Sequence, residues 1–443
     1  MAPVLSAMLH ERQLTFGCYG HTLNHRQAIS PDGNWAVYDT RNNDSHIART
    51  DAIEIVHLDS GEIKRLYQTV DQTEFGPGVG AASFHPNKPL VAFIHGLENC
   101  ASEKPYSVAR RFGTIVDINA PGIMTHAEAR SVLNADGSGT RPFGALSGGT
   151  HAHSWSKDGW LSFTYNDAWL ESRSLPNGPF RNQRSVGFMV PYMPVCVDDR
   201  GVDVSDPESF SGAYCAFLAA SLCVEARNGS DDIEAAVEEC WVGANHRALA
   251  FLGAVRGESG DLVNEIFVCD LPNGSQWNEI ANRIGSATEM DTNKLLEPVA
   301  GCAQRRLTRT THRTFPGVQG PRCWLVSSPA GKFLFAPMRD DRGIAQLCRI
   351  NILDGKIEQV TDLEQSLEGQ ISIDPSGSLC SFICDQRICL VDLPSGSIRW
   401  LTERSAASLV GAIHFAGENR FAFNRYVGTD RERWLQVFIG EIR

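Results

Sequence analysis

Two histidines separated by one residue, His151 and His153, have the clearest potential for chemistry in this chain. On a β-strand, alternate side chains point to the same side, so the pair is expected to present both imidazoles together. Two such imidazoles are half of a divalent-metal site, with Mn²⁺ or Ca²⁺ as the expected ion. His312, which precedes another predicted inner strand, is the first choice for a third ligand. The alternative is that these histidines hydrogen-bond to backbone groups.

Two arginines offer a way to bind a carboxylate. Arg313 follows His312 directly, and Arg322 lies at the next predicted inner strand. A guanidinium group donates paired hydrogen bonds that match the two oxygens of a carboxylate. The alternative is that both arginines form salt bridges between neighbouring structural units.

Other side chains suit acid–base catalysis or stacking. His21 precedes the first copy of a repeated turn, and His95 ends a predicted strand, where a purely structural role is the alternative. Trp155 and Tyr165 offer aromatic faces to a sugar ring. The sequence contains no nucleotide-binding loop and no Gly-x-Ser-x-Gly nucleophile elbow.

A short sequence motif that repeats along the chain indicates the strands that position these residues. Each copy is a tight turn of the type Ser-Pro-Asp-Gly, followed by a run of apolar, β-branched and aromatic residues. In such a turn proline presets its backbone dihedral angle, aspartate bonds the backbone and glycine accepts a positive φ. The clearest copies are residues 30–33 (SPDG), 85–88 (HPNK), 156–159 (SKDG), 328–331 (SPAG) and 374–377 (DPSG).

Repeats of about 40–50 residues built from short strands and tight turns are typical of a β-propeller. We therefore predict an all-β protein whose residues 1–443 form a single domain, a seven-bladed β-propeller with four antiparallel strands in each blade. The second strands are placed by their first residues, at Trp35, Leu90, Leu161, Ala248, Phe333, Leu379 and Arg420.

The fourth copy of the repeat is degenerate. Residues 212–222 (GAYCAFLAASL) are predicted to be the inner strand of that blade. Residues 231–240 (DDIEAAVEEC) are predicted to be a short helix, because an acidic start suits the positive end of a helix dipole.

The start of the chain is expected to close the ring. Residues 13–16 (QLTF) resemble the blade-ending phrases RLT at residues 306–308 and WLT at residues 400–402. Residues 12–16 are therefore predicted to complete the seventh blade, whose other strands lie at 410–443. Closure of this kind removes exposed strand edges.

Composition narrows the functional classes. The formal net charge of −12 argues against a general nucleic-acid binder, although a local Arg/His pocket can still take an anion. No run approaches 18 apolar residues, so no membrane span is expected. The start of the chain lacks signal-peptide features, and the 13 scattered cysteines form no CxxC pair. Both favour a cytoplasmic location, which a removed signal peptide would change to a secreted or periplasmic one.

The repeat resembles the TolB-type propeller repeat. From end to end, the chain resembles the YidR-like family of bacterial proteins, through segments such as SPDGNWAVYDTR, GGTHAHSWSKDGWLSFTYND and MRDDRGIAQL. The architecture is also similar to that of the oligogalacturonate lyases and other propeller polysaccharide lyases. This second resemblance implies a histidine-rich metal site in the central funnel, with a glutamine ligand for which Gln319 and Gln370 are both candidates.

Together these observations predict a metal-assisted lyase that cleaves a uronic-acid-containing oligosaccharide by β-elimination. The reaction requires a base for the C5 proton, a cation that neutralises the C6 carboxylate and an acid for the leaving oxygen. The alternative is a non-catalytic TolB-like propeller that binds an anionic ligand or a protein partner. Metal analysis of the purified protein, repeated on His151→Ala, separates the two.

Overall fold

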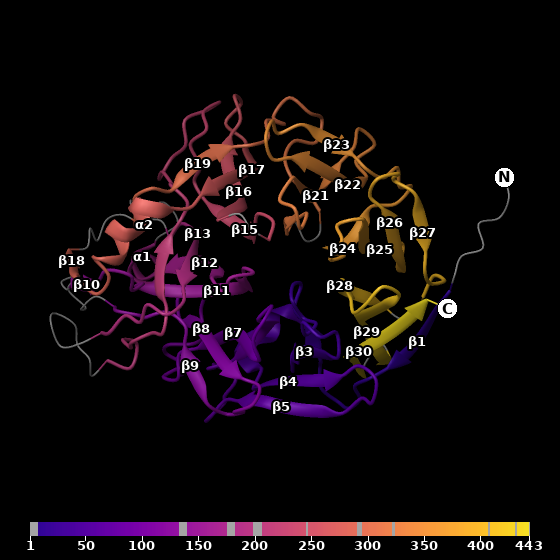
Figure 1. The fold of residues 1–443 in the computed structure, drawn as a ribbon, viewed down its shortest axis with the longest axis horizontal. Coiled ribbons are helices and arrows are strands. Elements are labelled where there is room, and N and C mark those ends of the chain that lie inside the picture. The colour runs from indigo at the N-terminus through magenta and orange to yellow at the C-terminus, as the bar shows by residue number, and fades with distance from the viewer. Residues whose placement is uncertain are drawn as a thin grey trace.

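The computed structural model describes residues 8–132, 140–174, 182–197, 206–244, 247–289, 295–320, 324–405, 408–429 and 432–442. These residues form seven four-stranded antiparallel sheets that follow one another round a central axis, so the predicted seven-bladed β-propeller is confirmed (Figure 1).

The strands of each blade run in chain order from the axis outward, except in the last blade. Blade 1 contains β2 (Thr22–Leu23), β3 (Trp35–Asp39), β4 (Ala52–His57) and β5 (Ile63–Gln68). Blade 2 contains β6 (Val79–Phe84), β7 (Leu90–Gly96), β8 (Arg111–Asp117) and β9 (Met124–His126). Blade 3 contains β11 (Gly148–Trp155), β12 (Leu161–Asp167), β13 (Ser185–Val190) and β14 (Cys215–Leu218). Blade 4 contains β15 (Ala236–Trp241), β16 (Ala248–Arg256), β17 (Leu262–Asp270) and β19 (Ala303–Arg306).

The remaining blades follow the same plan. Blade 5 contains β20 (Val326–Ser327), β21 (Phe333–Arg339), β22 (Ala345–Asn351) and β23 (Ile357–Gln359). Blade 6 contains β24 (Leu367–Ile373), β25 (Leu379–Cys384), β26 (Arg387–Asp392) and β27 (Ile398–Trp400). Blade 7 contains β28 (Leu409–Phe415), β29 (Arg420–Thr429), β30 (Glu432–Ile442) and β1 (Leu9–Gln13). All seven second strands begin at the residues predicted from the turns.

The fourth blade differs from the prediction. Residues 215–218 form the outermost strand of blade 3, not the inner strand of blade 4. The inner strand of blade 4 is β15, so the helix predicted over residues 231–240 is wrong. The acidic residues that suggested a helix start form ion pairs with arginines instead, Asp231 with Arg309 at 2.6 Å and Asp232 with Arg227 at 2.8 Å.

The ring closes as expected, with a strand from each end of the chain in the same sheet. β1 pairs antiparallel with β30, from Leu9 opposite Ile442 to Gln13 opposite Phe438. The closing strand therefore covers residues 9–13, slightly earlier than the predicted 12–16. Both Leu9 and Leu14 are buried there, so closure also completes the apolar packing of the last blade.

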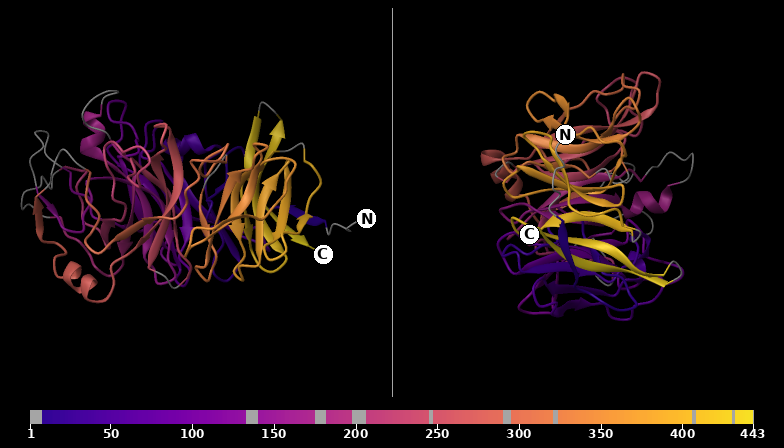
Figure 2. Two further views of the ribbon diagram at one scale, coloured as in Figure 1. Left: turned by 90° about the horizontal axis from the view of Figure 1, so that it is seen from above. Right: turned by 90° about the vertical axis from the view of Figure 1, so that its right-hand side faces the viewer.

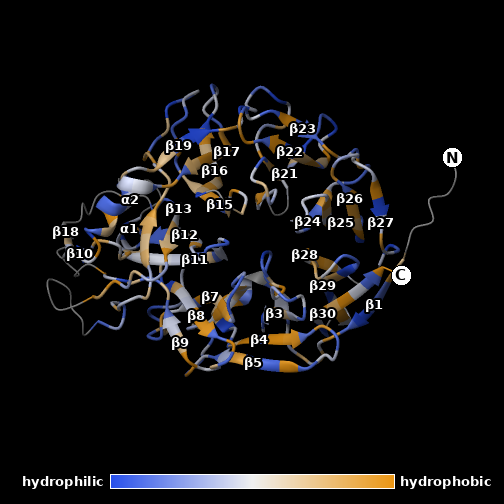
Figure 3. Ribbon diagram, in the orientation of Figure 1, coloured by the Kyte–Doolittle hydropathy of each residue, from blue (hydrophilic) through white to orange (hydrophobic). Residues whose placement is uncertain are grey.

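Apolar packing between blades holds the ring together. The strands are largely apolar and the connecting loops largely polar (Figure 3). Between blades 1 and 2, for example, Val37 and Ile55 belong to the same cluster of buried side chains as Phe84 and Phe93. Because each blade packs on the next in this way, the inner strands are fixed in position around the axis.

The two faces of the ring differ. Helix α1 (Ala168–Arg173) projects from one face and helix α2 (Gly274–Ala281) from the other (Figure 2). The hairpin formed by β29 and β30 rises on the same face as α1 (Figure 2). Outside the blades lie a two-stranded sheet of β10 (Thr140–Pro142) and β18 (Ala287–Glu289) and a 3-10 helix, η1 (Asp44–Arg49).

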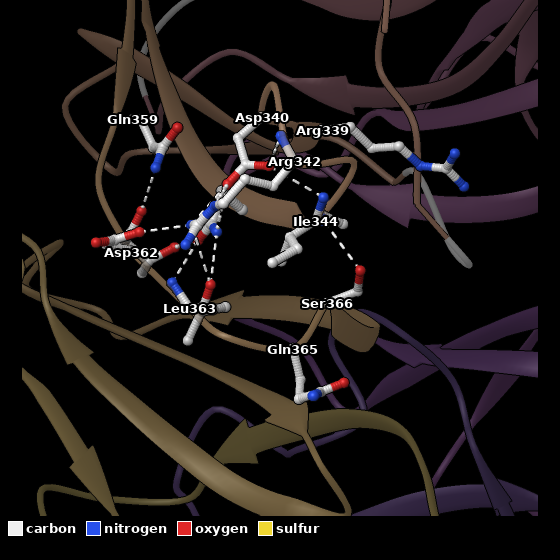
Figure 4. Close-up of polar contacts among 12 residues, drawn as sticks. Arg339, Asp340, Arg342, Ile344, Gln359, Asp362, Leu363, Gln365 and Ser366 are labelled. Atoms are coloured by element: carbon white, nitrogen blue, oxygen red, sulfur yellow. Dashed lines mark hydrogen bonds and ion pairs between the residues drawn. The ribbon is translucent and has the colours of Figure 1, made fainter.

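The turn between β21 and β22 braces the connection from blade 5 to blade 6. Asp340 accepts hydrogen bonds from the Arg342 side chain and from the Ile344 backbone at 3.0 Å. Arg342 also reaches Asp362 at 2.6 Å and the Leu363 carbonyl at 3.2 Å (Figure 4). These charged groups bond to one another and to the segment around Asp362, so they have a structural role.

Candidate functional site

A bulge shapes the inner strand in most blades. At the same point of β6, β11, β15, β24 and β28 the pairing with the second strand shifts register. A residue at each shift has a positive φ: Ala81, Ala152, Glu238, Gly369 and Gly411. An extra residue of this kind bends the strand and changes which side chains face the axis.

Blade 1 makes a longer detour at the equivalent place. Leu23 and Ile29 pair with Tyr38 and Ala36, so residues 24–28 stand opposite a single residue of β3. The detour carries the chain away from its own blade and onto the axis. Residues 24–27 are called the axial segment below.

The axial segment is held by hydrogen bonds to several blades. The Arg26 guanidinium donates to the carbonyl oxygens of Glu239 in blade 4 and of Leu325, at 2.5 Å, in the segment that leads into blade 5. Gln27 bonds the backbone of Trp155 in blade 3 twice, its amide donating to the carbonyl and its carbonyl accepting from the N–H, both at 2.8 Å. The segment therefore spans the centre of the ring.

Two cavities lie along the axis, on either side of the axial segment. The larger, about 750 Å³, opens on the face that carries α1, since Tyr426 and Arg433 of the β29–β30 hairpin line it. The smaller, about 430 Å³, is lined by Arg26 and Trp155. His25 borders both cavities and stacks on Trp324, with 4.0 Å between ring centroids.

The larger cavity has a cationic lining. Its basic side chains are His25, Arg41, Arg111, His151 and Arg433. Among the described lining residues Glu368 carries the one carboxylate, and it accepts a hydrogen bond from Gln386 at 2.6 Å. Although the whole chain is acidic, this cavity therefore favours an anionic ligand.

Arg111 is the cation of this cavity with the least compensation. It is 5% exposed, and it donates a hydrogen bond to the Tyr106 hydroxyl at 3.3 Å. Its Nε has no hydrogen-bond partner, and no carboxylate among the described residues pairs with it. By contrast, Arg41 is held by Asp39 at 2.6 Å. A buried guanidinium without a counter-charge is costly unless a ligand supplies one.

His151 lies beside Arg111 in the same cavity, and its Nδ1 has no hydrogen-bond partner. Burial lowers the pKa of His151 well below the usual value, and the positive charges of Arg111 and Arg184 lower this pKa further. The ring is therefore a neutral imidazole at neutral pH. A neutral imidazole with a free nitrogen is able to accept a proton.

His153 does not share the position of His151. The bulge at Ala152, with φ of 61°, interrupts the alternation that the sequence analysis assumed. His153 is fully buried, with its Nε2 3.0 Å from the Thr150 hydroxyl, and it does not line the cavity. Of the pair, the structure places His151 but not His153 on the larger cavity.

The expected metal ligands do not converge. His312 is exposed in the loop before blade 5, and the neighbouring Arg313 donates to the Arg339 carbonyl at 2.9 Å. No three His, Cys, Asp or Glu side chains in the described part of the chain form a group that fits a metal ion. Of the two candidate glutamines, Gln370 lines the larger cavity with an Oε1 that has no hydrogen-bond partner, whereas Gln319 donates to the Pro316 carbonyl at 2.6 Å. Arg322 falls outside the described residues.

Two histidines considered for catalysis are buried in the blades. His21 packs between Tyr19 and Tyr38, and His95 accepts or donates a 2.9 Å hydrogen bond with the Tyr67 hydroxyl. Burial lowers the pKa of each to about 4. Neither lines a cavity on the axis, so the structure gives both a place in the core.

The two aromatic candidates also lie away from the larger cavity. Tyr165 is fully buried and donates to Asp167 at 2.9 Å, so no sugar ring can stack on it in this structure. Trp155 lines the smaller cavity, with 3% of its surface exposed. Sequence reasoning missed Arg111 because it considered the inner strands and their leading loops, whereas Arg111 begins the third strand of blade 2.

The propeller fold is shared with lyases of known structure. Oligogalacturonate lyase from Vibrio parahaemolyticus superposes with a TM-score of 0.52 at 10% identity, covering 98% of this chain and 97% of that one. A manganese complex of oligogalacturonate lyase superposes with a TM-score of 0.50 at 8% identity and the same coverage. At these identities the likeness is one of fold. No helix in the described ranges has the length and apolar character needed to cross a membrane.

Sequence comparisons are more specific. Residues 78–202 match a family described as a protein of unknown function, DUF3748. The protein YidR of Escherichia coli, strain K12, is 34% identical over 411 residues, which is 92% of this chain and 92% of YidR. Identity at this level over nearly the whole of both chains shows that this chain belongs to the YidR family.

Proposed function

We propose that the larger cavity binds an acidic oligosaccharide and that the protein cleaves it by β-elimination next to a uronic acid. The observation that carries the proposal is the pair formed by Arg111, buried without a carboxylate partner, and His151, with a free Nδ1. The likeness in fold to oligogalacturonate lyases supports the choice of a uronate.

A ligand carboxylate would complete the environment of Arg111. A guanidinium group donates two parallel hydrogen bonds to a carboxylate, and such charge-assisted bonds are stronger than those between neutral groups. The same contact prepares the chemistry, because it neutralises the C6 carboxylate and so favours loss of the neighbouring C5 proton. Arg433 adds a further positive charge to the cavity.

The elimination transfers two protons, breaks the C5–H and C4–O bonds and forms the C4=C5 double bond. The neutral His151 ring takes the C5 proton, and the electrons of that C–H bond form the C4=C5 double bond. The bond from C4 to the glycosidic oxygen breaks, and that oxygen leaves with a proton from a donor. No step is assigned to Mn²⁺ or Ca²⁺, since the described residues do not form a group that fits either ion.

The product of this reaction can be seen directly. Its C4=C5 bond is conjugated with the carboxylate and absorbs ultraviolet light, so pectic, glucuronate-bearing and ulvan-type oligosaccharides can be screened with and without Mn²⁺ or Ca²⁺. Wild type should raise the absorbance on one of them. His151→Ala should lower the rate at least about 100-fold, as expected for loss of a general base, while still binding the substrate in calorimetry.

Arg111→Gln tests the binding half of the proposal. It should weaken binding about 10- to 100-fold, because a charge-assisted hydrogen-bonded contact is lost. Arg404→Gln is the matched control, since this side chain is 74% exposed and pairs with Asp385 on the surface. Unchanged affinity in Arg111→Gln would show that the cavity does not use this arginine.

Recognition without cleavage is the second candidate function. It is favoured by the polar groups of the cavity, because the Tyr426 hydroxyl already donates to the Asn42 carbonyl at 2.7 Å and Glu368 is bonded to Gln386. Neither is free to protonate a leaving oxygen. Tight binding of an intact acidic oligosaccharide, with no absorbance on any substrate, would establish this function instead.

A further inference from the structure

One of the bulge positions around the axis holds a large charged residue where the others hold alanine or glycine. Ala81, Ala152, Gly369 and Gly411 occupy this position in four blades, and all four line the larger cavity. In blade 4 the same position holds Glu238, with φ of 59°. A left-handed backbone is unfavourable for a residue with a long side chain, and such residues concentrate at functional sites.

Glu238 also has an unusual environment. It is partly buried, and its Oε2 is buried without a hydrogen-bond partner. The charged groups that act on it are Arg26 of the axial segment, Arg184 at the start of β13, and Glu239 next to it in β15. The carboxylate of Glu239, unlike Oε2 of Glu238, has hydrogen-bond partners, because it accepts from Ser162 and Thr164.

Glu238 and His151 lie on neighbouring blades. Their inner strands, β15 and β11, contact each other. Arg184 lies close enough to act electrostatically on both side chains. Among the described residues, the larger cavity is lined by blades 1, 2, 3, 6 and 7 and by Trp324. Glu238 is not one of the lining residues, and it occupies the equivalent bulge position in blade 4.

We propose that Glu238 is the proton donor for the leaving oxygen, which deepens the proposed elimination and rests on it. As the C4–O bond breaks, the O–H bond of the Glu238 carboxylic acid breaks too, and its proton goes to that oxygen. Glu238 is left as a carboxylate and His151 as an imidazolium. Exchange with water returns both to their starting forms before the next turnover.

The protonation state of Glu238 agrees with this role. Burial raises the pKa of Glu238 to about 7, against the lowering effect of Arg26 and Arg184. A substantial share of the carboxyl groups is then protonated at neutral pH, when His151 is neutral. A carboxylic acid that keeps its proton near neutral pH can act as a general acid, and a neutral imidazole can accept a proton.

The test compares two substrates on wild type, Glu238→Gln and the exposed control Glu258→Gln. The first substrate is the oligosaccharide on which wild type is active. The second is a uronate glycoside whose C4 oxygen carries a nitrophenyl group, which leaves without needing a proton. Glu238→Gln should lose about 100-fold or more on the first and stay within about 10-fold of wild type on the second. Retained turnover of the second substrate also shows that the variant is folded.

The pH profile gives a second readout. Wild-type kcat should fall as the pH rises above about 7, the pKa of Glu238, and this alkaline limb should be missing in Glu238→Gln. Equal loss on both substrates, or activity within about threefold of wild type on the oligosaccharide, overturns the donor role and leaves the proposed function standing. Wild type inactive on every substrate overturns both proposals.

Discussion

Arg26 is expected to be a major contributor to the stability of the ring. Its guanidinium group donates to two backbone carbonyls, those of Glu239 and Leu325, which belong to different parts of the ring. A hydrogen bond from a charged donor contributes about 1.5–3 kcal/mol, and removing the donor leaves the acceptors without partners. Arg26→Ala should therefore lower the free energy of unfolding by roughly 3–6 kcal/mol.

This change can be converted into a melting temperature. At about 2.1 cal/mol/K per residue, the unfolding entropy of a 443-residue chain is roughly 0.9 kcal/mol/K. Arg26→Ala should accordingly lower Tm by about 3–6 °C in differential scanning calorimetry at neutral pH. Arg26→Lys keeps the charge but offers no fork to bridge both carbonyls, so its Tm should lie between those of Arg26→Ala and wild type.

The control is a surface arginine that pairs with one carboxylate. Arg404 is 74% exposed and lies 3.0 Å from Asp385, and an exposed ion pair contributes about 1 kcal/mol or less. Arg404→Ala should stay within about 1 °C of wild type. If Arg26→Ala were equally mild, the axial segment would not be held by Arg26, and the account of a braced axis would fail.

Three further predictions concern stability and the division between core and site. Deleting residues 1–17 removes β1 and the buried Leu9 and Leu14, so Tm should fall by several degrees, and an unchanged melting curve would contradict ring closure. Burial raises the pKa of Glu128 to about 7, so wild type should lose stability as the pH rises from about 4.5 through 7, and urea unfolding of Glu128→Gln should show a smaller loss. Tyr165→Phe removes the hydrogen bond to Asp167, so it should lower the free energy of unfolding by about 1–3 kcal/mol and leave oligosaccharide affinity unchanged. Weaker binding in calorimetry would show that Tyr165 takes part in binding.

The fold could be predicted because its strongest signals are local. Each Pro-Asp-Gly-type turn is fixed by the residues within it, so the second strands could be placed at the residue where they begin. Blade 4 was the exception because the acidic pair Asp231 and Asp232 just before its inner strand resembles a helix start. The backbone of that strand is bonded by Arg26, which donates to the Glu239 carbonyl and is more than 200 residues away in the chain.

The site was harder to predict because it depends on departures from ideal strand geometry. The His-x-His argument required strict alternation, which the positive φ at Ala152 interrupts, and only His151 lines the larger cavity. Alanine gives no warning of such a conformation, whereas the equivalent Gly369 and Gly411 do. Arg111 gave no signal of its own either, because its importance comes from the missing counter-charge, which only the fold reveals.

Two of the charged groups on the axis, Arg26 and Glu238, come from blades in which the repeat is broken. Four blades place alanine or glycine at the bulge, and such residues bring no charge to the axis. Blade 1 replaces the bulge with the detour that carries Arg26, and blade 4 replaces the small residue with Glu238. The repeats therefore reveal the architecture. Of the groups proposed for binding and proton transfer, Arg111 and His151 come from blades with a regular bulge, and Glu238 comes from a blade that deviates.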